Sequence, residues 1–264
     1  MNRKSLSITD LETMKRQGEK IACLTAYDAS FSALIDQANI DVMLVGDSLG
    51  MVIQGHDSTL AVTLDDMVYH TRCVSRSRKR AFVIADLPFM TYPDPPSAAN
   101  HAAELMRAGA QMVKLEGARF DTVRVLVDLG IPVCGHLGLL PQSINRLGGY
   151  KVQGIDPVEA DKIIVDALTL QDAGASLLVL ECVPAKLAAT ISSQLVIPVI
   201  GIGAGPDCDG QVLVIHDLLG LFDRFVPKFI KRYANLKEEA VRAIQEYRKE
   251  VEEGVFPSEE QSFK

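Results

Sequence analysis

Eight short runs of apolar residues recur along the chain, and each has the length of one buried β-strand. Continuous apolar runs, rather than alternating ones, are typical of parallel strands that helices cover on both faces of a sheet. Eight is also the strand number of a closed β/α barrel. The runs occupy residues 21–25, 42–45, 82–85, 112–115, 131–134, 177–180, 196–200 and 212–215.

Segments with the spacing of helices separate these runs. Several of them begin with a capping residue or an early proline, and several end at a glycine, as helices commonly do. The regular alternation of strand and helix predicts a parallel sheet, so the sequence predicts a (β/α)8 TIM barrel. The predicted helices include residues 64–75, 97–107, 121–129, 157–172 and 184–194.

Two more helices are predicted at the ends of the chain. Thr9 and Glu12 have the spacing of a capping box, which predicts a short leading helix within residues 1–18 that closes one end of the barrel. Residues 236–264 form a predicted C-terminal helix and tail, whose many charges indicate a solvent-exposed face. We expect residues 1–264 to be a single domain, with two small domains as the less favoured alternative.

The composition narrows the class of partner. The formal charge is −7, from 34 acidic and 27 basic residues, which argues against general binding to nucleic acid or to an anionic membrane. Small molecules are the expected partners. No apolar stretch near the start has the length of a secretory signal or a membrane span, so we expect a cytoplasmic protein. The five scattered cysteines favour buried reduced thiols over disulfides or a structural zinc site.

Charged and polar residues follow most of the apolar runs, where a barrel enzyme has its active site. Side chains alternate along a strand, so an ionisable residue two positions beyond an apolar one shares its face. We therefore expect Val45, Ile84, Cys134 and Val179 to fill the barrel, each directly below an ionisable residue at the mouth. The residues that follow the runs are Tyr27 and Asp28, Asp47 and Ser48, Asp86, Lys114 and Glu116, His136, Glu181, and the pair His216 and Asp217.

Each candidate taken alone has an ordinary structural explanation, such as a helix cap, a loop salt bridge or a packed histidine. Their convergence favours a functional site over these structural explanations. Several carboxylates cannot all be ionised in one small space without a bound cation or raised pKa values. Asp47, Asp86 and Glu116 offer oxygen ligands that suit Mg²⁺, whereas zinc favours histidine and cysteine. A metal that held a 2-oxo acid would stabilise its enolate, which predicts carbon-acid chemistry.

Three connections carry weaker signals. Residues 48–63 and 137–156 are long for simple loops, and the second is our candidate for a lid. The glycine-rich turn at residues 201–205 could present backbone N–H groups to an anion or could be a tight turn under a crowded helix.

Many of these segments recur in the same order in one known family. The chain resembles ketopantoate hydroxymethyltransferase from about residue 25 to its C-terminus. The shared motifs are Leu-Val-Gly-Asp-Ser-Leu-Gly (44–50), Gln-Gly-His-Asp-Ser-Thr (54–59), Ala-Asp-Leu-Pro-Phe-Met (85–90), Val-Lys-Leu-Glu-Gly (113–117), Gly-His-Leu-Gly-Leu (135–139), Gly-Gly-Tyr-Lys-Val-Gln-Gly (148–154), Leu-Glu-Cys-Val-Pro (180–184) and Gly-Ile-Gly-Ala-Gly (201–205).

The resemblance implies a barrel of the phosphoenolpyruvate mutase/isocitrate lyase type. It implies transfer of a hydroxymethyl group from 5,10-methylenetetrahydrofolate to 3-methyl-2-oxobutanoate through a Mg²⁺-stabilised enolate. The product is 2-dehydropantoate, on the route to pantothenate and coenzyme A. It also implies a homo-oligomer, commonly a decamer.

The resemblance also assigns roles to the candidate residues. By motif, Asp47 and Asp86 match Mg²⁺ ligands that also face the substrate, and Glu116 lies at the metal. Ser48, Lys114 and His136 match residues that hold the oxo acid. Glu181 matches the base that removes the C3 proton.

Two alternatives belong to other classes. Lys114 could form a Schiff base in an aldolase, although Glu116 close by would keep this lysine charged. A ligand-binding or scaffold barrel without turnover is the third reading, and the convergence of ionisable groups argues against it.

Overall fold

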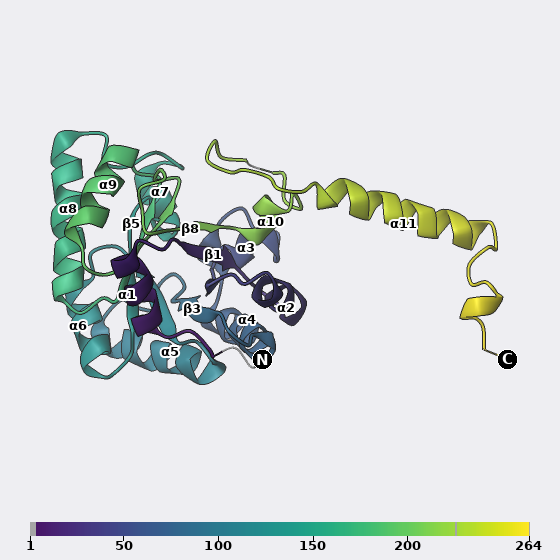
Figure 1. The fold of residues 1–264 in the computed structure, drawn as a ribbon, viewed down its shortest axis with the longest axis horizontal. Coiled ribbons are helices and arrows are strands. Elements are labelled where there is room, and N and C mark those ends of the chain that lie inside the picture. Colours follow the sequence, from purple (N-terminus) through teal and green to yellow (C-terminus); the bar gives the residue numbers. More distant parts are fainter. Residues whose placement is uncertain (1–3, 225, 264) are drawn as a thin grey trace. The chain divides into compact units, whose positions relative to one another are not determined.

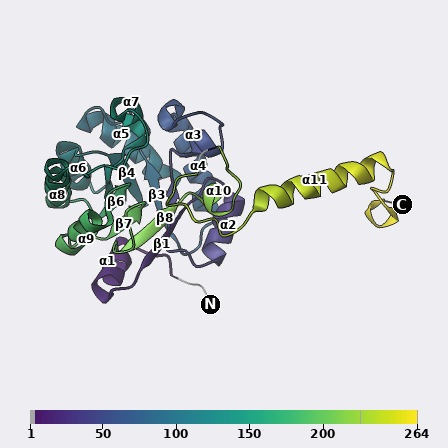
Figure 2. The ribbon, with the colours of Figure 1, turned by 90° about the horizontal axis from the view of Figure 1, so that it is seen from above.

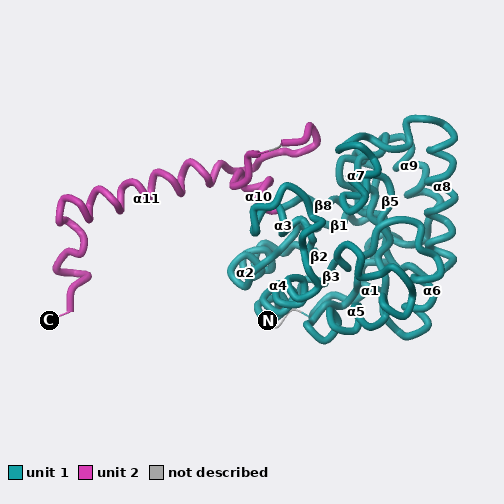
Figure 3. Tube along the Cα trace, turned by 180° about the vertical axis from the view of Figure 1, so that it is seen from behind, with its two compact units in different colours: residues 1–214 teal, residues 215–264 magenta. Residues whose placement is uncertain are grey.

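A computed structural model of the chain describes residues 4–224 and 226–263. The chain divides into two compact units, residues 1–214 and residues 215–264, which Figure 3 colours separately. All eight strands belong to the first unit. The expectation that residues 1–264 form one domain stays a prediction.

Unit 1 is a closed barrel of eight parallel strands, which confirms the predicted fold class. The strands pair in chain order, and β8 pairs with β1 to close the barrel. Figures 1 and 2 show the helices of this unit arranged around the strands. The strands are β1 (Ile21–Thr25), β2 (Val42–Val45), β3 (Phe82–Asp86), β4 (Met112–Glu116), β5 (Val133–Gly138), β6 (Leu177–Glu181), β7 (Val199–Ile202) and β8 (Gly210–Leu213).

The fifth and seventh strands begin at Val133 and Val199, two and three residues later than predicted. Pro132 and Pro198 stand directly before them, and proline has no N–H to donate to a sheet. Their carbonyl groups still accept hydrogen bonds from the neighbouring strands, at 3.0 Å in each case. Apolar character alone therefore placed these strand starts too early.

The eighth strand begins at Gly210, so the predicted range of residues 212–215 was two residues late. A Cβ atom on Gly210 would lie 2.4 Å from the carbonyl oxygen of Ile21 on β1. This close approach requires glycine, a residue that a search for apolar runs passes over.

Well-capped helices connect the strands. Asp94 caps α5 and is followed by prolines, Asp156 caps α8 in the same way, and Thr63 forms a capping box with Asp66 at the start of α4. Both long loops contain short helical turns. The connecting elements are α2 (Ala29–Gln37), α3 (Leu49–Val52), η1 (Thr59–Ala61), α4 (Leu64–Ser77), α5 (Pro95–Ala108), α6 (Phe120–Asp128), η2 (Pro141–Ser143), α7 (Ile144–Leu147), α8 (Pro157–Asp172) and α9 (Ala185–Gln194).

The predicted leading helix is α1 (Ile8–Gln17), but its capping box is not the predicted one. Ser7 is the N-cap, and its hydroxyl pairs with Asp10 at the third helical position. The box therefore begins two residues earlier than the pair Thr9 and Glu12, because aspartate serves where glutamate was expected. Leu11 of α1 is 1% exposed and joins the core inside the barrel.

The barrel interior is filled by alternate residues of the strands. Ile84, Cys134 and Val179 belong to this core, as predicted. Val45 does not, because β2 contributes Val42 and Leu44 to the interior, and Val45 pairs with Ala85 on the opposite face. The prediction that Val45 lies below Asp47 inside the barrel was wrong.

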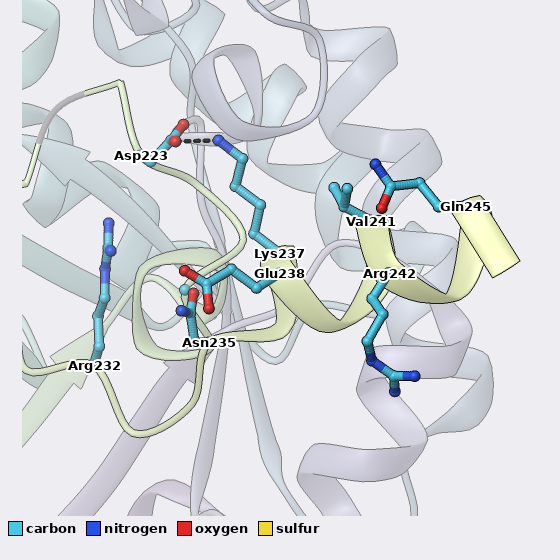
Figure 4. A pocket seen from close by; sticks show the side chains of 9 residues that line it. Asp223, Arg232, Asn235, Lys237, Glu238, Val241, Arg242 and Gln245 are labelled. Atoms are coloured by element: carbon cyan, nitrogen blue, oxygen red, sulfur yellow. Dashed lines mark hydrogen bonds and ion pairs between the residues drawn. The ribbon is translucent and has the colours of Figure 1, made fainter.

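Unit 2 consists of α10 (Ile215–Leu218), α11 (Leu236–Glu252) and η3 (Glu259–Gln261). Ion pairs four residues apart, such as Arg248 with Glu252 at 2.8 Å, follow the exposed surface of α11. Figure 4 shows a surface pocket at the start of α11, where Asp223 and Lys237 form an ion pair. Among the described residues, none of the helices combines the length and apolar character needed to cross a membrane.

The buried position of Leu11 leads to a prediction about stability. Leu11→Ala should lower the free energy of unfolding by about 3 kcal/mol, because it leaves a cavity in the barrel core. Leu34→Ala is the matched control, since Leu34 is 59% exposed and its loss should change stability by less than about 0.5 kcal/mol. Urea unfolding at one protein concentration measures both, and equal losses would show that α1 does not stabilise the core.

Candidate active site

The ionisable residues at the ends of β3, β4 and β5 lie side by side, because the strand register pairs them. Asp86 pairs with Lys114, and Glu116 pairs with His136. On the far side of β5, Glu181 pairs with Gly138. The prediction that these five residues converge at the carboxyl end of the barrel is confirmed by this register.

Asp47 and Ser48 join the site by a turn rather than by strand alternation. Gly46 follows the last residue of β2, and the next N–H group, of Asp47, donates to Asp86 Oδ2 at 3.1 Å. A Cβ atom on Gly46 would lie 2.8 Å from Ser48 Oγ, so a side chain there would displace the Ser48 hydroxyl. Ser48 Oγ is also 2.8 Å from the hydroxyl of Tyr27, which follows β1.

Lys114 supplies the positive charge of the site. Its Nζ atom lies 3.1 Å from Asp86 Oδ1 and 3.4 Å from His136 Nδ1. Burial alone would lower the pKa of Lys114, but the carboxylates of Asp86, Glu116 and Asp47 outweigh burial and raise the pKa well above its ordinary value. Lys114 is therefore a charged hydrogen-bond donor, which disfavours its use as the nucleophile of a Schiff-base aldolase.

His136 is a neutral imidazole in a defined tautomer. Burial, and then the charge of Lys114, hold its pKa well below the ordinary value. Because the ammonium group of Lys114 can only donate, Nδ1 must accept and Nε2 must carry the hydrogen. Nε2 lies 3.2 Å from Glu181 Oε2 without meeting the geometry of a hydrogen bond, so the imidazole stands between Lys114 and Glu181.

The carboxyl groups of the site have raised pKa values. Burial, and then the neighbouring Asp86, raise the pKa of Asp47 to about 7. Burial raises the pKa of Glu181 to about 7 as well. Burial, and then the charge of Asp47, raise the pKa of Glu116 well above its ordinary value. Lys114 is the only buried lysine or arginine in residues 4–224 and 226–263, so these acids share one fixed cation.

Two neutral residues of the site were missed by the sequence analysis. Gln142 lies in η2 after β5, and its side-chain Nε2 atom donates to Asp47 Oδ2 at 2.8 Å. The Tyr92 hydroxyl donates to Gln142 Oε1. Neither residue follows an apolar run or carries a charge, so the search for ionisable groups at strand ends had no signal for them.

The donor set suits a hard cation, although it is not a complete cage. Glu116 Oε1 is buried and makes no hydrogen bond, which is unusual for a buried polar atom and points to a further partner, whereas Asp86 Oδ1 already has its ion pair with Lys114. In the described parts of the chain, no group of three or more His, Cys, Asp or Glu side chains is placed to hold a metal ion. Mg²⁺ needs fewer, since it typically takes one or two carboxylates and completes its shell with water and substrate. Carboxylates that suit Mg²⁺ are therefore present, and the assignment of all three of Asp47, Asp86 and Glu116 as its ligands stays a prediction.

The two long loops meet over this end of the barrel. The Tyr150 hydroxyl of the second loop lies 3.6 Å from Met51 Sδ of the first. The charge of Glu181 helps to raise the pKa of Tyr150, after burial, which places this tyrosine near the site. The lid role of residues 137–156 stays a prediction.

The glycine-rich turn after β7 is explained by close packing. A Cβ atom on Gly201 would lie 2.8 Å from Cys208 Sγ, and one on Gly205 would lie 2.4 Å from Ala185 Cβ. These contacts account for both glycines without an anion. His216 and Asp217, the last candidates, belong to α10 of unit 2.

Comparison with known proteins places these residues in a family context. The family model described as ketopantoate hydroxymethyltransferase matches residues 5–259. The proteins named 3-methyl-2-oxobutanoate hydroxymethyltransferase of Psychromonas ingrahamii and Moorella thermoacetica are 56% and 54% identical to this chain over 260 and 266 residues. The first alignment covers 98% of each chain, and the second covers 99% of each chain.

Solved structures with the same fold are more distant in sequence. The 2,3-dimethylmalate lyase of the PEP mutase/isocitrate lyase superfamily has a TM-score of 0.60 and 17% identity, over 97% of this chain and 91% of that one. A phosphonopyruvate hydrolase, solved in complex with oxalate and Mg²⁺, has a TM-score of 0.62 and 12% identity, over 96% and 92% of the two chains. These similarities confirm the predicted type of barrel.

The raised pKa of Glu181 predicts a pH-dependent cost in stability. A carboxyl group whose pKa rises from 4.5 in the unfolded chain to about 7 in the folded one binds its proton more tightly when folded. The folded state therefore loses stability as the pH rises from 4.5 to about 7, and the loss is constant above that range.

Glu181→Gln removes this titration. In the metal-free protein it should raise the free energy of unfolding at about pH 8 by on the order of 2 kcal/mol, and the gain should nearly vanish at about pH 5. Glu104→Gln, at an exposed glutamate of α5, is the control and should give no pH-dependent gain. Urea unfolding at the two pH values measures the free energy of unfolding of each variant. A gain of the same size at both pH values would contradict the raised pKa of Glu181.

Proposed function

Because the chain belongs to the ketopantoate hydroxymethyltransferase family, we propose that it transfers a hydroxymethyl group from 5,10-methylenetetrahydrofolate to 3-methyl-2-oxobutanoate. The C3–H bond of the oxo acid breaks, C3 bonds to the transferred carbon, and water supplies the hydroxyl oxygen. The products are 2-dehydropantoate and tetrahydrofolate. The product would serve pantothenate and coenzyme A biosynthesis.

The observation that carries this proposal is the carboxyl group of Glu181. It ends β6 at the mouth of the barrel, and burial raises its pKa to about 7. A general base works best when its pKa is near the working pH, because it is then both deprotonated and able to accept a proton. His136 Nε2, 3.2 Å from Glu181 Oε2, lies close enough to orient this carboxyl group.

The charged lysine and the hydroxyl of Ser48 suit the anionic substrate. Lys114 offers an ammonium group for the negative charge of a 2-oxo acid, and its ion pair with Asp86 holds it in place. Ser48 is oriented by the Tyr27 hydroxyl at 2.8 Å. Lys114, Ser48 and His136 would thus orient the oxo acid so that C3 faces Glu181.

Asp47 and Asp86, with Glu116 beside them, would hold Mg²⁺. When bound, Mg²⁺ supplies Lewis acidity, which stabilises negative charge that develops on the keto oxygen of the substrate. The phosphonopyruvate hydrolase of the same fold, crystallised with oxalate and Mg²⁺, supports this combination of ligand classes. We also propose a cytoplasmic homo-oligomer, a decamer by family resemblance.

The base role of Glu181 predicts a selective loss in one partial reaction. Glu181→Gln should slow the exchange of the C3 proton of 3-methyl-2-oxobutanoate with solvent by about 10²–10⁴-fold, because an amide cannot accept that proton. Proton NMR in deuterated buffer measures the exchange, with Glu104→Gln as the charge-matched control on an exposed helix face. Exchange at the wild-type rate in Glu181→Gln would refute the base assignment.

The metal requirement predicts the effect of chelation. Treatment with EDTA and desalting should remove most of the hydroxymethyl transfer, and added Mg²⁺ should restore it. The reaction is followed by formation of 2-dehydropantoate. If activity survived complete metal removal and borohydride trapped the substrate on Lys114, the Schiff-base alternative would replace the metal mechanism.

A further inference from the structure

Gln142 is a buried amide among the acids of the site, and none of the roles above uses it. It is 6% exposed and lies in the turn η2, which begins at Pro141, three residues after β5 ends at Gly138. We propose that Gln142 is a positioning residue that fixes the carboxylates of Asp47 and Glu116 and thereby sets how tightly the site binds a divalent cation. This inference rests on the proposed function and deepens its metal site.

The orientation of the amide follows from its neighbours. Gln142 Nε2 lies 3.0 Å from the carbonyl oxygen of Leu87 and 2.8 Å from Asp47 Oδ2. The Leu87 carbonyl can only accept, so the atom that faces it must be the donating nitrogen. Both hydrogens of Nε2 are then used, one for the backbone after β3 and one for the carboxylate after β2.

The other side of the amide is held by a tyrosine. Oε1 must face the Tyr92 hydroxyl, which donates to it and in turn accepts from the Glu116 N–H group at 3.4 Å. The backbone N–H group of Gln142 donates to Glu116 Oε2 at 3.0 Å. These bonds form a closed ring between Glu116, Tyr92 and Gln142, so a rotation of the amide would break several at once.

The ring anchors one oxygen of each carboxylate. Asp47 Oδ2 is held by the Gln142 side chain, and Glu116 Oε2 is held by its backbone. The second oxygen of Glu116, Oε1, is buried and makes no hydrogen bond. Fixing one oxygen of a carboxylate sets the direction of the other, which is how partners of metal ligands usually act.

The amide does this without adding charge. A lysine or arginine in the same place would also donate hydrogen bonds, but it would neutralise the carboxylates that attract a cation. A glutamine donates these hydrogen bonds without carrying a charge, so the negative charge of the acids stays available. Gln142 therefore orients the acids while Lys114 remains the only buried fixed cation among the described residues.

Two variants separate this role from general packing. Gln142→Met keeps the length of the side chain and adds no charge, but it removes the donor to Asp47 Oδ2 and the Leu87 carbonyl and the acceptor for Tyr92. Tyr92→Phe keeps the glutamine and removes only the hydroxyl that holds its amide. Gln194→Met is the control, because it makes the same chemical change at an exposed residue at the end of α9.

Binding of Mn²⁺ to the metal-free full chain, titrated by electron paramagnetic resonance, is the readout. Gln142→Met should raise the Mn²⁺ dissociation constant by about 10–100-fold. Tyr92→Phe should raise it by a smaller factor, and Gln194→Met should leave it unchanged. Thermal unfolding of each variant shows that the protein is folded when the metal is added.

The outcomes distinguish this inference from the proposed function. If folded Gln142→Met and Tyr92→Phe bound Mn²⁺ as tightly as the wild type, Gln142 would be a packing residue and the inference would be overturned. If the wild type formed 2-dehydropantoate but bound no Mn²⁺, the inference and the metal site would both be refuted, and the proposed reaction would be confirmed. If the wild type bound Mn²⁺ with the expected losses in the variants but formed no product, only the proposed reaction would fail.

Discussion

The ion pair between Lys114 and Asp86 is the interaction on which the site depends. Its two charged atoms lie 3.1 Å apart between neighbouring strands, and both side chains are almost fully buried. A buried carboxylate without a partner costs several kcal/mol, so the other acids around this pair cannot all be ionised as well. Asp47, Glu116 and Glu181 accordingly have raised pKa values, and the protein carries acids that only a bound cation or protons can balance.

The barrel makes this crowding possible because it separates stability from chemistry. Apolar residues at alternate positions of the strands, together with Leu11 of α1, fill the barrel interior. They lie below the row of ionisable residues that form the site. The row itself stands at the carboxyl ends of the strands, where side chains from several strands face one space. A dense core can therefore support a site whose own electrostatics oppose folding, which is the usual relation between stability and activity in enzymes.

The sequence was sufficient for those parts of the site that follow strand periodicity. Lys114 and Glu116 lie two residues apart on β4, and the same rule brought Asp86, His136 and Glu181 to the mouth. The rule failed for Val45, because Asp47 reaches the site through the turn that Gly46 begins and not through the face of β2. Prolines and a glycine also displaced strand starts, since hydrogen-bonding capacity and close approach are not visible in apolar character.

Gln142 and Tyr92 escaped the sequence analysis for a different reason. Their importance lies in contacts between segments that are far apart in the chain, such as Gln142 with Asp47, which no local pattern encodes. For the proposed function the site would have to attract a cation and an anionic oxo acid together, and one lysine with several acids can serve both only if each charge keeps its own place. Lys114 is fixed by its ion pair with Asp86, whereas Asp47 and Glu116 are held by neutral donors that leave their charge intact. The uncharged amide of Gln142 thus holds acids in place beside a lysine without neutralising them. Charged residues alone could not keep opposite charges close together and still separate.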